Sequence, residues 1–130
     1  MKPGLTVGTA AQVEARVTED MCPAFDGVVV HWVYSTWSLA HHMELAARKV
    51  LAPFLEEHEE GLGTHLSIEH LGPTPVGKTV RVEARATAVG EHRLVCAVEA
   101  YDGERMIGRG EQVQRVLPKR VIANLIERYE

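Results

Sequence analysis

The chain has 130 residues, enough for one domain with a hydrophobic core. Hydrophobic residues make up 45% of it and charged residues 25%, which are ordinary proportions for a globular protein. Its net charge of −4, with scattered basic residues, argues against a nucleic-acid partner.

Features that would indicate secretion, a membrane or a metal are missing from the sequence. The first residues, MKPGLTVGTA, contain no apolar stretch of signal-peptide length. The most apolar run, residues 27–40, is interrupted by polar side chains and predicts no transmembrane helix. Cys22 and Cys96 form neither a disulfide framework nor a metal-binding motif. We therefore expect a single domain over residues 1–130, soluble and cytoplasmic, with no membrane contact, metal or cofactor.

A strand, a loop and a long helix are predicted for the first half of the chain. Residues 12–17 alternate between apolar and polar side chains, as a strand does. The next segment, residues 19–27, contains proline and glycine and is expected to be a loop. The helix begins between residues 33 and 38 and continues to about Glu57.

Both ends of this helix carry recognisable signals. Ser35 or Thr36 could be the N-cap. Pro53 cannot donate to the helical hydrogen bonds and predicts a kink or an irregular last turn. The sequence EEGLG, residues 59–63, is expected to end the helix.

Four alternating segments and a short terminal helix are predicted after the long helix. Asp102 and Gly103 are the strongest hairpin signal, and Gly90 and Glu91 indicate another tight turn. This order predicts an α+β fold in which an antiparallel sheet of about five strands wraps around one long helix. The four segments are residues 64–71, 78–89, 93–101 and 105–116, and the terminal helix lies within residues 118–130.

Glu44 is out of place in the long helix. At about 100° per residue, it falls inside an apolar stripe that includes Met43, Ala47 and Leu51. We therefore expect its side chain to face the inner side of the sheet. Carboxylates are rarely buried without a partner, although a glutamate at a helix edge or a subunit interface would give the same pattern.

Two further polar side chains are expected near Glu44. Thr36 lies on the same side of the helix, and His70 shares a strand face with Leu66 and Ile68. A glutamate and a histidine in a dry pocket have the protonation flexibility that acid–base catalysis requires. Taken singly, Thr36 could equally be a helix cap and His70 a hydrogen-bonded structural residue.

Gly63 is a fourth candidate, because it lies between the helix and the strand that carries His70. A bare backbone N–H at this position could approach a ligand closely and polarise a carbonyl group. The alternative is that Gly61 and Gly63 only terminate the helix. His41 and His42 lie outside the apolar stripe, and no second pair at ligand spacing supports a metal site.

The spacing of these residues resembles a known family. Glu44 follows Thr36 by eight residues, His70 follows Glu44 by twenty-six, and Gly63 precedes His70 by seven. The pattern is similar to that of the hotdog-fold thioesterases of the fluoroacetyl-CoA thioesterase-like family. The resemblance continues through APFLE, TPVGKTV, DG and IGRG, and covers roughly residues 34–116.

This resemblance implies a hotdog fold and hydrolysis of an acyl-CoA thioester to a carboxylic acid and free CoA. It implies that the Gly63 N–H polarises the thioester carbonyl and that Glu44 is either the nucleophile or the base that activates water. It assigns acid–base chemistry to His70 and a hydrogen bond to Glu44 to Thr36. It also implies an acyl-CoA substrate and a homodimer or dimer of dimers with sites at subunit interfaces.

Two departures from the family pattern argue against selectivity for fluoroacetyl-CoA. Residues 27–35 are rich in valine and tryptophan, where the fluoroacetyl enzyme has a longer, phenylalanine-rich lid. Gln114 stands where that enzyme has an arginine. We therefore expect a different acyl group, small or medium in size. The alternatives are a non-catalytic acyl-thioester-binding protein and a hotdog enoyl-CoA hydratase.

Overall fold

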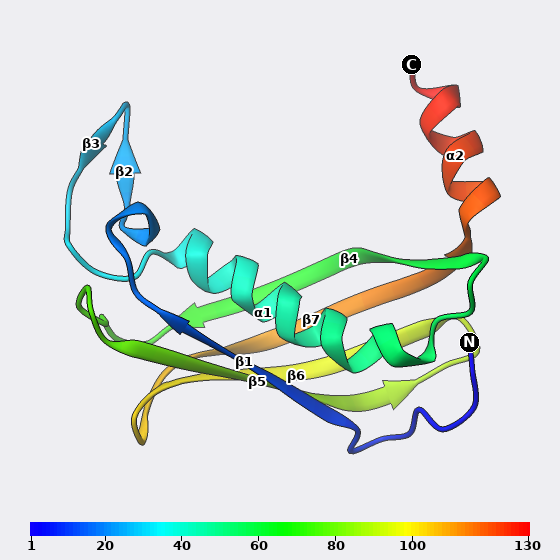
Figure 1. Ribbon diagram of the computed structural model, residues 1–130, viewed down its shortest axis with the longest axis horizontal. Coiled ribbons are helices and arrows are strands. Elements are labelled where there is room, and N and C mark those ends of the chain that lie inside the picture. The colour runs from blue at the N-terminus through cyan, green and yellow to red at the C-terminus, as the bar shows by residue number, and fades with distance from the viewer.

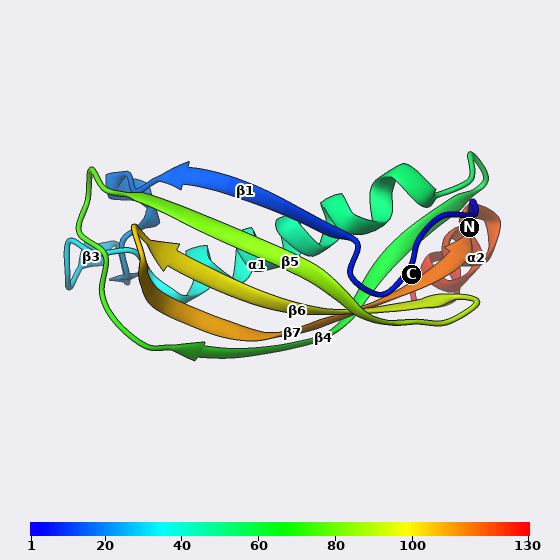
Figure 2. The same cartoon turned by 90° about the horizontal axis from the view of Figure 1, so that it is seen from below.

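A five-stranded antiparallel sheet curves around one long helix, α1 (Thr36–Leu51), in the computed structural model, which describes all 130 residues (Figure 1). The strands are β1 (Ala10–Arg16), β4 (Glu59–His70), β5 (Thr79–Val89), β6 (Arg93–Asp102) and β7 (Arg105–Pro118). Their order across the sheet is β1-β5-β6-β7-β4, and they lie side by side in this order in Figure 2. The predicted architecture is confirmed, and it leaves β1 and β4 as the edge strands.

Smaller elements extend from both ends of this layer. A short hairpin stands beyond the first turn of α1, and the terminal helix projects from the opposite end (Figure 1). No helix is long and apolar enough to cross a membrane. The short elements outside the sheet and α1 are η1 (Glu19–Met21), β2 (Ala24–Phe25), β3 (Val28–Val29), η2 (Ala52–Phe54) and α2 (Lys119–Arg128).

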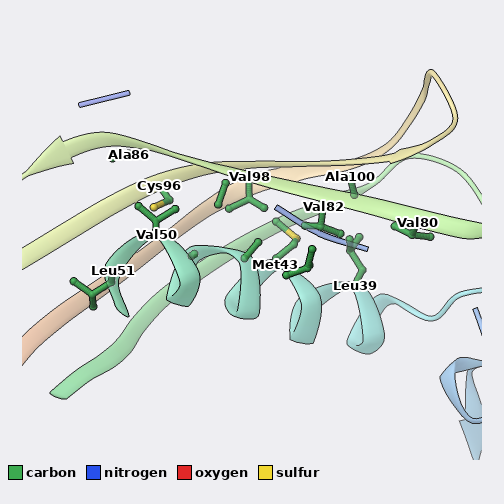
Figure 3. Close-up of a cluster of buried hydrophobic side chains, with 14 of the residues drawn as sticks. Leu39, Met43, Val50, Leu51, Val80, Val82, Ala86, Cys96, Val98 and Ala100 are labelled. Carbon is green, nitrogen blue, oxygen red and sulfur yellow. The ribbon is translucent and has the colours of Figure 1, made fainter. Parts of the chain in front are cut away.

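The hydrophobic core lies between α1 and the concave face of the sheet. Leu39, Met43 and Leu51 of α1 are fully buried and point toward the strands, as Figure 3 shows. Val82 and Val98 meet them from β5 and β6. The core therefore uses the apolar stripe that the helical periodicity predicts.

The alternation predicted for residues 78–89 holds over most of β5. Val80, Val82, Ala84 and Ala86 are buried, as expected for one face of a strand. A register shift between Ala86 and Ala88 then turns the strand, and Ala88 is exposed. Strict alternation over residues 78–89 would place Ala88 on the buried face as well, but sequence alternation does not reveal the bulge.

The long helix ends earlier than predicted. It stops at Leu51, a 3₁₀ turn containing Pro53 follows, and residues 59–63 already belong to β4. The irregular turn at Pro53 was expected, but the extension to Glu57 and the role of EEGLG as a helix end were wrong. A Cβ at Gly61 would lie only 2.7 Å from Cδ2 of Leu51, so glycine here permits β4 to pass close to the helix.

Candidate active site

Thr36 is the first residue of α1 rather than its cap. The Oγ of Ser35 accepts a hydrogen bond from the backbone N–H of Ser38 at 3.1 Å, so Ser35 is the N-cap. This leaves the Thr36 hydroxyl free to hydrogen-bond Nδ1 of His70, at 2.8 Å. His70 reaches it because β4 runs antiparallel to α1 and ends beside the start of the helix (Figure 1).

The imidazole of His70 is partly buried. Its Nε2 makes no hydrogen bond within the chain, and the Tyr34 ring meets the imidazole edge-on at 6.4 Å between centroids. Burial lowers the pKa of His70, although the neighbouring backbone of Gly72 opposes this effect. At neutral pH the ring is therefore uncharged, with one nitrogen occupied by Thr36.

Thr36 and His70 open into a cavity of about 490 Å³. Phe25, Val30 and Val33 line it, supplied by the β2–β3 hairpin and the segment that leads into α1. A hydroxyl and a neutral imidazole thus lie together in a pocket with apolar walls.

Glu44 lies near the middle of α1, and its side chain faces the inner side of β4 and β7, as predicted. It is exposed, however, and is not buried within the apolar stripe. The fully buried positions are its neighbours Met43 and Ala47, and the Glu44 side chain projects past the edge of the core toward β4. Oε2 of Glu44 lies 3.3 Å from the point that a Cβ on Gly63 would occupy. The carboxylate forms no ion pair within the chain.

Glu44 and Gly63 line a second cavity, of about 260 Å³, whose wall includes Arg48. Gln112 and Gln114 of β7 close its inner side and are 2% and 3% exposed. Sequence reasoning treated Gln114 only as a departure from a family pattern and missed Gln112. Gln112 and Gln114 are two residues apart and therefore share one face of β7. Two polar side chains on the face of a strand that packs on the core could have indicated this part of the site from the sequence.

The four predicted site residues therefore form two pairs and not one cluster. Thr36 and Glu44 are eight residues apart on one helix, which separates them by about 12 Å along the axis. No nitrogen of His70 lies within 4.0 Å of a carboxylate oxygen of Glu44. Within one chain, Thr36 hydrogen-bonds His70 and not Glu44, contrary to the role that the resemblance implied for it.

Tyr34 and His42 form a further pair that sequence reasoning missed. His42 is buried, and its Nδ1 lies 2.5 Å from the Tyr34 hydroxyl. Burial raises the pKa of Tyr34 and lowers the pKa of His42, and the charge of neighbouring His41 lowers the latter further. Helical spacing could not find this pair, because Tyr34 precedes the helix. Nowhere do three His, Cys, Asp or Glu side chains converge in a group that could hold a metal ion.

A five-stranded antiparallel sheet wrapped around one long helix is the hotdog fold, and here polar pairs line the exposed side of that helix. The family model for fluoroacetyl-CoA-specific thioesterases (FlK) matches residues 17–120. The chain therefore belongs to this family.

Individual relatives agree with this assignment. A fluoroacetyl-CoA thioesterase from Streptantibioticus cattleyicolor is 38% identical over 85 residues, which is 65% of this chain but only 61% of that protein. A thioesterase superfamily member from Thermus thermophilus is 39% identical, with a TM-score of 0.93 over 98% of this chain and 94% of that chain. The crystal structure of FlK gives a TM-score of 0.89 at 27% identity, over 98% of both chains.

Proposed function

We propose that the protein hydrolyses the thioester bond of an acyl-CoA and releases a carboxylic acid and free CoA. The observation that carries this proposal is the unpaired carboxylate of Glu44 beside the bare backbone of Gly63, in a chain of this family. FlK structures include complexes with acetyl-CoA and with fluoroacetate and CoA, which supports this substrate class.

Each site residue has a role that suits its environment. Glu44 is the nucleophile or the base, because it carries an unneutralised charge next to an open cavity. The N–H of Gly63 polarises the thioester carbonyl. Because His70 is neutral at rest, it first takes up a proton, from Glu44 or from solvent, and then passes it to the departing thiolate. Thr36 holds the imidazole by the hydrogen bond to Nδ1.

We propose that a second copy of the chain completes each site, in a homodimer. The Thr36–His70 pair lies at the start of α1 and the Glu44–Gly63 pair near its middle, on the face that α1 shares with β4, and β4 is an edge strand. A two-fold axis between the pairs would bring Thr36 and His70 of one chain opposite Glu44 and Gly63 of the other.

Exposed apolar side chains flank this edge and support the dimer. Trp37, next to Thr36, is 47% exposed, and Leu62, next to Gly63, is 36% exposed. Apolar side chains beside an unpaired strand edge are typical of an interface.

The walls of the Thr36 cavity favour a small or medium, apolar acyl group. Phe25, Val30 and Val33 supply apolar surface, and no Lys, Arg, Asp or Glu lines the cavity to pair with a charged acyl group.

The proposal is tested by thiol release from acyl-CoAs of increasing chain length. The wild type is expected to release thiol, and Glu44→Ala and His70→Ala are each expected to lose about 10³-fold in kcat. Unchanged rates in both variants would reject the assigned roles. Loss of enoyl-CoA absorbance without thiol release would favour a hydratase, and thermal stabilisation by acyl-CoA without turnover would favour a binding protein.

Mixing two inactive variants tests the shared site. In a dimer of one Glu44→Ala chain and one His70→Ala chain, one site retains both His70 and Glu44 if they come from different subunits. Refolding an equal mixture should then restore about a quarter of the wild-type activity, because about half of the dimers are mixed and each has one intact site. A mixture as inactive as its components would show that each site lies within one chain.

A further inference from the structure

One buried side chain in the Glu44 cavity has no structural explanation. Gln112 of β7 is 2% exposed, and its Oε1 forms no hydrogen bond. Leaving a buried amide oxygen unpaired costs stability. Gln114, on the same strand face, shows the structural alternative, because its Nε2 donates to the carbonyl of Ala47 at 3.0 Å.

The amide nitrogen of Gln112 and the carboxylate of Glu44 face the same small space above Gly63. The point where a Cβ of residue 63 would lie is 3.2 Å from Nε2 of Gln112 and 3.3 Å from Oε2 of Glu44. Because residue 63 is glycine, no side chain fills this space. An oxygen atom held farther from the Gly63 backbone than this point, between the two groups, can hydrogen-bond both at ordinary distances of about 2.8–3.0 Å.

The two groups select the kind of oxygen, because Glu44 offers only acceptors and Nε2 of Gln112 offers only donors. Next to the Glu44 carboxylate, an oxygen must donate a hydrogen bond, because two acceptors repel each other. Next to Nε2 of Gln112, the same oxygen must accept one. Water does both, whereas a thioester carbonyl oxygen has no hydrogen to donate.

We propose that Gln112 and Glu44 hold the water molecule that hydrolyses the thioester, with Glu44 as its general base. The water oxygen bonds to the thioester carbon, and one water proton passes to Glu44. The tetrahedral intermediate then collapses with cleavage of the carbon–sulfur bond, and the departing thiolate takes up the proton that Glu44 had accepted, which returns Glu44 to the carboxylate. This inference rests on the proposed function and selects between the two roles left open for Glu44.

The variant Gln112→Leu separates a catalytic role from a structural one. Leucine has a similar shape and removes the amide, so kcat is expected to fall about 10- to 100-fold with little change in KM. The thermal unfolding temperature should stay the same or rise, because the unpaired oxygen is removed as well. The matched variant Gln114→Leu loses the bond to Ala47 and should unfold at a lower temperature, whereas Gln112→Leu should not.

The variant Gln112→Glu is tested by its kcat–pH profile, which would not change if Gln112 served only in packing. A second carboxylate beside Glu44 disfavours ionisation of both, so the acidic limb of the kcat–pH profile should shift to higher pH. Wild-type kcat in Gln112→Leu, or an unshifted profile in Gln112→Glu, would overturn the role of Gln112.

A single turnover in H₂¹⁸O, quenched rapidly and analysed by mass spectrometry, tests the role of Glu44. General-base catalysis predicts one solvent oxygen in the first acid released and no acyl group on the protein. An acyl adduct on Glu44, or unlabelled product, would overturn the inference. If the wild type releases no thiol from any acyl-CoA, the proposed function fails as well, whereas an active wild type with fully active Gln112→Leu rejects only the Gln112 role.

Discussion

The two polar pairs beside α1 differ in charge, burial and surroundings. Thr36 and His70 bond each other against Tyr34, in a pocket with apolar walls, and burial keeps the imidazole neutral. Glu44 lies on the surface beside glycine and glutamines and has no partner in the chain. The start of the helix thus offers neutral hydrogen-bonding groups, and its middle offers a carboxylate without a partner. In the proposed homodimer, one chain would supply the neutral pair and the other chain the carboxylate.

The largest effect on kcat is expected from replacing the carboxylate of Glu44. Glu44→Gln keeps the size of the side chain and should reduce kcat by about 10³-fold or more. Because the side chain is exposed, the free energy of unfolding should change by no more than about 0.5 kcal/mol. Thiol release and chemical denaturation measure the two quantities. The exposed Glu57→Gln is the control, and an equal loss of activity there would contradict a specific role for Glu44.

Two neighbouring glycines should respond differently to alanine. A methyl group on Gly63 enters the space between Glu44 and Gln112, so kcat should fall about 10- to 100-fold with little change in stability. A methyl group on Gly61 meets Leu51 at 2.7 Å and should cost about 1–3 kcal/mol of stability. Activity and unfolding assays on both variants measure this contrast. The reverse pattern would show that Gly63 serves packing.

A smaller effect on kcat is expected at the start of α1, where Thr36 bonds His70. Thr36→Val keeps the shape of the side chain and removes the hydrogen bond to His70, so kcat should fall about tenfold, the effect of one positioned hydrogen bond. Thr36→Ser keeps the hydroxyl and should stay near the wild-type rate. If serine and valine are equally impaired, the threonine methyl group matters and the hydrogen bond does not.

The smallest effect is on the pH dependence of stability. Burial lowers the pKa values of His42 and His70 in the folded state, so the unfolded chain binds more protons below about pH 6.5. Stability should therefore be complete at neutral pH and fall as the pH drops through this value. Unfolding temperatures between pH 7 and pH 5 measure the slope.

A histidine variant shows which residue causes the loss of stability between pH 7 and pH 5. His42→Asn retains an acceptor for Tyr34 but cannot be protonated, so its stability should fall less steeply toward pH 5 than that of the wild type. The exposed His65→Asn should behave like the wild type. Equal slopes in all three proteins would place the effect elsewhere.

Much of the fold could be predicted from local patterns. Alternation in residues 78–89 and the Asp102–Gly103 hairpin reflect the period of two of a strand and the positive φ of 61° at Gly103. The apolar stripe of α1 was predicted because it repeats with the helical period. These features depend on neighbours in sequence, and so the sequence is sufficient for them.

The site could be predicted only in part. A helical wheel places Thr36 and Glu44 on one side of the helix but omits the axial distance between them, and therefore suggested a single cluster. The exposure of Glu44 depends on where the sheet stops, which is a property of β4 and β7 and not of the helix.

The sequence by itself determined the order of the elements, their apolar faces and the four residues proposed to act in catalysis. Only the tertiary structure decided that α1 ends at Leu51, that Thr36 bonds His70, and that Gln112 lies beside Gly63. The physical reason is that periodicity records the direction of a side chain around its own element. Partners on other elements follow from strand register, bulges and the close approach of backbones, which arise only when the elements pack.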